Sequence, residues 1–171
     1  MSSRSHITLV LVCLAACSPS GETAGGEREA SARGAATAGP CQLLTAADVQ
    51  AVTGVTVQRI DRNPAIGAGG NCVNFAGADG QAYLGVNRLG STGEFTAAVN
   101  AVPADVYPEK VSMPGLGEEA LLFKGPGGLR YLVVRQGTSG VVLFPLGTGV
   151  EMSDQQLRDL AAKALASAEG S

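Results

Sequence analysis

Residues 120–146 read ALLFKGPGGLRYLVVRQGTSGVVLFPL, three apolar runs separated by two glycine-rich turns. Each run is short, rich in aliphatic and aromatic residues and bounded by Gly, which is typical of β-strands joined as hairpins. Tyr131–Val134 and Val141–Phe144 are apolar almost without interruption. We therefore expect these two strands to lie in the centre of a sheet and to be covered on both faces.

A second strand-rich region lies upstream. Cys72–Ala76 and Gln81–Leu89 flank the turn Gly77–Gly80, which predicts another hairpin, and Val55–Ile60 predicts a shorter strand before it. Apolar residues alternate in this region, at Val73 and Phe75 and again at 82, 84 and 86. Such alternation is typical of strands that bury one face.

Capping boxes, in which Ser or Thr is followed three residues later by an acid or Gln, mark three helix starts. They begin at Thr45, Ser91 and Ser153. The third helix carries an apolar stripe at helical spacing, which we expect to be a core face: Leu157, Leu160, Ala161, Ala164 and Leu165.

These elements predict an α+β domain over residues 40–171. Their order is α-β-β-β-α-β-β-β-α, and the hairpin connections favour a mainly antiparallel sheet of about six strands with three helices packed against it. The chain has 171 residues, and its hydrophobic fraction of 45 % favours a folded core over disorder.

The N-terminal segment predicts export. Ile7–Ala16 is mostly apolar, but a ten-residue helix spans only about 15 Å, whereas a bilayer-spanning helix needs roughly 20 residues. Residues 1–16 therefore read as a signal peptide. The run ends Leu14-Ala15-Ala16-Cys17, which resembles the lipobox of bacterial lipoproteins. The resemblance implies cleavage before Cys17 and lipidation of its sulfur, commonly with palmitate among the acyl chains; a plain secretory signal is the alternative.

Residues 18–39 predict a flexible tether between the lipidated Cys17 and the domain. The segment contains Gly, Ala, Ser, Thr and mixed charges without apolar periodicity, so it has too little apolar surface to order itself. As a flexible coil it has an r.m.s. span of roughly 25 Å.

The cysteines predict one disulfide. Of the four, Cys13 leaves with the signal peptide and Cys17 takes the lipid, so Cys41 and Cys72 remain in an exported chain. A metal site is the rival for this pair, but it lacks further ligands, because the only histidine of the chain is His6. We expect no metal and no cofactor.

Two motifs in the domain resemble a known family. The domain begins Pro40-Cys41-Gln42-Leu43-Leu44-Thr45-Ala46-Ala47-Asp48-Val49, and residues 113–120 read MPGLGEEA. Both are similar to motifs of small actinobacterial cell-envelope lipoproteins of unknown function. The resemblance extends over residues 40–168 and implies a location and a fold rather than an activity.

Few residues suggest chemistry. Glu118 and Glu119 adjoin a glycine-rich turn, where solvation explains them better than an acid–base pair. The glycine-rich stretch Gly67–Gly70 runs into a strand instead of a helix, so a loop is favoured over a phosphate cradle. Three strand arginines could line a site for an acidic ligand or could simply be solvated: Arg88, Arg130 and Arg135.

The net charge of −3 excludes the basic face that nucleic-acid binding requires. We therefore expect a membrane-anchored, non-catalytic binding domain on the extracytoplasmic side of the cell envelope. Its expected partner is a protein or an apolar or acidic small molecule, which the sequence does not identify further. A carboxylate-dependent hydrolase and a structural or inhibitor-like surface protein are the alternatives. Facing carboxylates in a cleft favour the hydrolase, and a cavity favours ligand binding.

Overall fold

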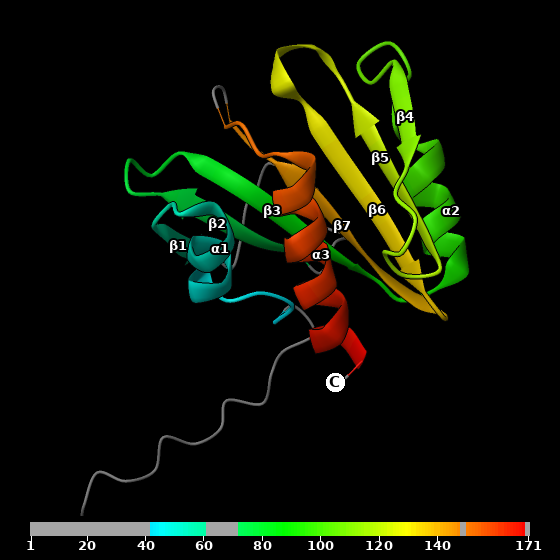
Figure 1. The fold of residues 1–171 in the computed structure, drawn as a ribbon, viewed down its shortest axis with the longest axis horizontal. Helices are drawn as coiled ribbons and strands as arrows, with labels where there is room; N and C mark the ends of the chain where they lie inside the picture. The colour runs from blue at the N-terminus through cyan, green and yellow to red at the C-terminus, as the bar shows by residue number, and fades with distance from the viewer. Residues whose placement is uncertain (1–41, 61–71, 148–149, 170–171) are drawn as a thin grey trace, which may run out of the picture. The chain divides into compact units, whose positions relative to one another are not determined.

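A single antiparallel β-sheet forms the centre of the fold (Figure 1). The computed structural model describes residues 42–60, 72–147 and 150–169, all within the unit Ala35–Ser171. In these ranges the strands are β1 (Val57–Ile60), β2 (Cys72–Gly77), β3 (Ala82–Leu89), β4 (Glu109–Ser112), β5 (Glu119–Lys124), β6 (Arg130–Gln136) and β7 (Ser139–Pro145). The helices are α1 (Ala46–Thr53), α2 (Thr92–Asn100) and α3 (Asp154–Glu169), and a 3-10 turn, η1, spans Pro126–Gly128. The predicted α+β class is confirmed.

All three helices begin where the capping residues predict. Thr45 accepts a hydrogen bond from the backbone of Asp48, whose carboxylate accepts one from the Thr45 backbone, so the box is complete. Ser153 and Gln156 form the same reciprocal pair before α3. Ser91 accepts from the Glu94 backbone, but the Glu94 carboxylate accepts from the backbone of Gly90 instead of closing the box.

The helices cover the sheet from both sides. On one face α1 and α3 bury the larger core, which includes Leu44, Val49, Leu132, Leu143 and Leu160. On the other face α2 inserts Phe95 against alternate residues of the same strands: Leu89, Leu121, Val133 and Val142. The neighbouring strands β6 and β7 therefore lie in the centre and are covered on both faces, as their apolar runs predict (Figure 1).

The strand count differs from the prediction, because the described ranges contain seven strands and about six were expected. The additional strand is β4, which lies at the edge of the sheet and pairs with β5 alone. Its sequence Glu109-Lys110-Val111-Ser112 contains one apolar residue, and its side chains are mostly exposed. A strand this short and polar gives no periodic signal, and it forms because β5 offers an unpaired backbone edge.

The two halves of the sheet meet where β3 pairs with β7. Residues 84–89 lie antiparallel to residues 140–145 in continuous register. Gly85 lies opposite Phe144, and a Cβ atom at Gly85 would overlap the Phe144 ring. The ring also stacks on Tyr131 of β6, with centroids 5.8 Å apart. Gly85 is thus required for close approach of an aromatic side chain.

We expect Gly85→Ala to lower the free energy of unfolding by about 1–3 kcal/mol, because the added methyl group displaces the Phe144 ring from a packed position. Chemical denaturation with matched slopes measures the change. In a Phe144→Leu background the same substitution should cost much less, since the smaller side chain leaves room. An equal cost in both backgrounds would show that the ring contact is not the cause.

Candidate functional site

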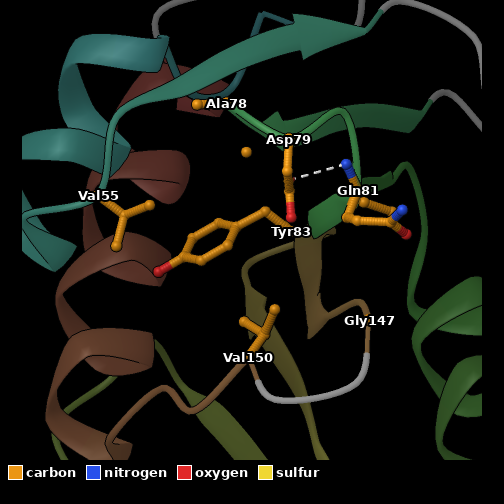
Figure 2. A pocket seen from close by; sticks show the side chains of 9 residues that line it. Val55, Ala78, Asp79, Gln81, Tyr83, Gly147 and Val150 are labelled. Carbon is orange, nitrogen blue, oxygen red and sulfur yellow. Dashed lines mark hydrogen bonds between the residues drawn. The ribbon is translucent and has the colours of Figure 1, made fainter.

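A hollow among the described residues lies at one end of the sheet, beside the β2–β3 turn (Figure 2). Its volume is about 590 Å³. Three segments that are distant in sequence line it: Val55 between α1 and β1, residues 77–83 around the β2–β3 turn, and Gly147 with Val150 between β7 and α3. We call this hollow the Tyr83 pocket.

Apolar side chains and one phenol form the body of the Tyr83 pocket. Figure 2 shows the Tyr83 ring extended between Val55 and Val150. Tyr83 and Val150 also pack against the core beneath α1 and α3, which holds both side chains in place. No hydrogen bond within the described ranges involves the Tyr83 hydroxyl. The pocket thus combines a fixed aromatic face with a free polar group.

The turn that forms the rim is held by its own sequence. Gly80 has a φ of +76°, which glycine adopts at little cost. The backbone N–H of Gly77 donates to the carbonyl of Gln81 at 2.9 Å. Asp79 accepts a hydrogen bond from the Gln81 backbone N–H at 3.0 Å, through Oδ1 (Figure 2). These bonds fix the carboxylate at the mouth of the pocket.

The opposite wall depends on a close backbone approach. Leu146 donates its N–H to the carbonyl of Tyr83 at 2.9 Å, which extends the contact between β7 and β3 beyond the last strand residues. Gly147 follows with a φ of +95°, and a Cβ there would lie 2.7 Å from the Ala82 carbonyl oxygen. A larger residue at this position would separate the two segments, so Gly147 keeps the wall against β3.

A second hollow, of about 420 Å³, lies at the start of α3 and is lined by Arg130, Glu151 and Gln156 among others. Arg130 donates from Nε to Oδ1 of Asp154 at 3.1 Å, and Lys124 contacts the other carboxylate oxygen at 2.7 Å. The Arg130 side chain that lines this hollow is therefore already paired with a carboxylate of the same chain. Partial burial raises the pKa of Asp154, but the hydrogen bonds from Lys124 and Arg130 outweigh it and hold that pKa below the ordinary value.

The three strand arginines do not converge on one site. Arg88 donates to the carbonyl of Ala168 near the end of α3, at 3.1 Å. Arg130 binds Asp154, and Arg135 binds Glu118 at 2.6 Å while its guanidinium lies over the Phe95 ring. Each arginine stabilises a different part of the fold, so the structure does not assemble them into an acidic-ligand site.

Glu118 and Glu119 lie close together because both carboxylates contact the same cation. Both contact Arg135, Glu118 at 2.6 Å from Nη1 and Glu119 at 3.7 Å from Nε. The side chains are about half exposed. Both carboxylates therefore share one guanidinium, an arrangement typical of an ion-pair cluster at a strand end rather than of an acid–base pair.

Several predicted site residues lie outside the part of the chain that the structure describes: Cys17, Cys41 and the stretch Gly67–Gly70. Cys72 opens β2 opposite Asn87, but its side chain also lies outside the description. The disulfide between Cys41 and Cys72 and the lipidation of Cys17 therefore stay predictions.

Two further features are absent from the described ranges. No cluster of three or more His, Cys, Asp or Glu side chains that could hold a metal ion is found there. No helix in those ranges is both long enough and apolar enough to cross a membrane.

Comparison with known proteins finds no matching family model, no matching curated protein and no matching solved structure. The resemblance to cell-envelope lipoproteins therefore remains a prediction from the sequence motifs.

Sequence reasoning missed the Tyr83 pocket. Gly77–Gly80 was expected only as a turn, and neither Val55 nor Val150 carries a motif. One local signal was present, because Tyr83 is an amphipathic aromatic residue near the start of its strand. Its neighbours in space come from other elements, so only the tertiary structure brings the pocket together.

The substitution Asp154→Asn removes the ion pairs with Lys124 and Arg130. We expect it to lower the free energy of unfolding by about 1 kcal/mol at pH 7, a modest figure because the carboxylate is 42 % exposed and partly screened. The folded-state pKa lies below the ordinary value of 3.8. The ionised carboxylate therefore contributes stability above pH 4, and this contribution disappears as the pH falls through the lowered pKa. Denaturation curves between pH 7 and pH 2 follow the difference between wild type and variant.

Asp159→Asn provides the matched control on α3. Among the described residues, Asp159 accepts a hydrogen bond from Gln155 alone, at 2.8 Å, so its substitution should change stability by no more than about 0.5 kcal/mol. If the cost of Asp154→Asn stayed constant down to pH 2, the ion pair would not be its source.

Proposed function

We propose that this chain is an exported lipoprotein, held at a membrane by lipid on Cys17, whose folded domain is a non-catalytic binding module. We assign the Tyr83 pocket as its ligand site. The observation that carries the assignment is the pocket's composition: apolar walls, a fixed aromatic ring and a few polar groups in about 590 Å³. Small-molecule sites are concave, mostly apolar and of this size.

The lining supports binding rather than bond cleavage. Hydrolytic sites need an activated nucleophile, a metal or two carboxylates with separated roles. The described residues that line the Tyr83 pocket include one carboxylate, Asp79, and no Ser, Cys, His or Lys. The alternative proposal of a carboxylate hydrolase gains no support from Glu118 and Glu119, because both carboxylates contact Arg135.

The anchor is proposed from the sequence. Leu14-Ala15-Ala16-Cys17 closes an apolar segment that is too short to span a bilayer. Each buried acyl methylene contributes about 0.8 kcal/mol, so two or more chains on Cys17 hold a protein firmly. Residues 18–39 then let the domain reach ligands within roughly 25 Å of the surface.

We expect Cys17→Ser to abolish incorporation of labelled palmitate and to prevent cleavage at the lipobox, because the sulfur is the acceptor of the lipid. Metabolic labelling and intact-mass analysis measure both effects. Cys13→Ser is the control, since Cys13 lies in the segment that is removed. Labelling that survives Cys17→Ser would rule out the proposed anchor.

The ligand site is tested on the full-length protein, extracted gently from its own membrane and examined by native mass spectrometry. We expect a bound small molecule in the wild type and its loss in Ala78→Trp, because an indole at this exposed rim position fills the mouth. Thr138→Trp in the β6–β7 turn adds the same bulk away from the pocket and should keep the ligand. A wild-type protein without ligand, or equal retention in both variants, would contradict the assignment.

A further inference from the structure

We infer that the ligand of the Tyr83 pocket carries a positive charge on an apolar body, an inference that rests on the function proposed above. Among the described residues that line the pocket, Asp79 is the one acidic residue, and none is Lys or Arg. The described lining therefore presents an acidic group without a neighbouring basic residue.

The Asp79 carboxylate is oriented but not neutralised. Its Oδ1 accepts the Gln81 N–H at 3.0 Å, and a Cβ on Gly77 would lie 3.0 Å from the same oxygen, so the missing side chain leaves room for the carboxylate. No ion pair of Asp79 exists within the described ranges. In contrast, the carboxylates of Asp154 and Glu118 are both paired with cations of this chain.

Tyr83 supplies the second element of cation recognition. The face of an aromatic ring carries negative potential, and cationic groups, quaternary ammonium above all, bind over it. Figure 2 shows the Asp79 side chain and the Tyr83 ring within the same hollow, with Val55 and Val150 beside the ring. A cation near the rim can thus contact the carboxylate and the ring while its apolar part lies against the valines.

The same arrangement selects against anions. An anionic ligand would approach Asp79, and no cation among the described lining residues would balance the repulsion. A neutral ligand would gain the apolar contacts alone. We therefore expect cationic, neutral and anionic molecules of similar size to bind in that order.

Three small probes with one aromatic ring test the order by isothermal titration calorimetry: benzyltrimethylammonium, benzyl alcohol and phenylmethanesulfonate. The full-length protein is used in an uncharged detergent. We expect the cation to bind about tenfold tighter than the alcohol, with a preference that declines as salt is raised. The sulfonate should bind more weakly than either.

Variants assign the preference to its two sources. Asp79→Asn keeps the Oδ1 acceptor of the turn but removes the charge, so it should bring the cation close to the affinity of the alcohol. Asp105→Asn removes an acid that does not line the pocket and should change nothing. Tyr83→Phe should retain the cation, whereas Tyr83→Leu should weaken it severalfold. Melting temperatures confirm that each variant is folded.

The outcomes separate the two proposals. Equal binding of cation and alcohol, tighter binding of the sulfonate, or a preference that survives Asp79→Asn would overturn the cation inference and leave the pocket as a ligand site. Failure of all three probes to bind the wild type would overturn both.

Discussion

Pairing between β3 and β7 is the constraint on which the rest of this fold depends. It joins a three-stranded meander to a four-stranded one, and residues 84–89 and 140–145 are more than fifty positions apart in the chain. The loop closure is entropically costly, and it is offset by burial of β7 on both faces, under α3 on one side and α2 on the other. Without this pairing neither meander has a complete core.

The local parts of the fold and the central position of β6 and β7 could be predicted from the sequence, whereas the pairing of β3 with β7 could not. The hairpin around η1 and the starts of the helices depend on residues that are close in the sequence, as at Thr45 and Ser153. The register of β3 against β7 instead places Phe144 over Gly85. No residue spacing in the sequence predicts this contact. Edge strand β4 was missed for a related reason, because its partner strand, not its own composition, makes it a strand.

The candidate site is one of the features that depend on contacts between distant parts of the chain. Asp79 and Gly80 predict a turn, and the turn is found, but it forms the rim of a pocket only because Val55 and Val150 from separate segments lie beside it.

The strand arginines show the opposite outcome, a predicted site that the structure does not assemble. Sequence alone suggested that they could gather around an acidic ligand, whereas Arg88, Arg130 and Arg135 each bind a separate partner within the chain. The three arginines therefore do not form a common site, although all three lie on strands of one sheet.

The edges of the sheet have a consequence for the protein at high concentration. Edge strands β1 and β4 have only four residues each, and β4 places Glu109 and Lys110 on its exposed border. Short edges with charged side chains are poor templates for strands of neighbouring molecules. Copies at high concentration can therefore collide without joining their sheets, which favours separate molecules over polymers.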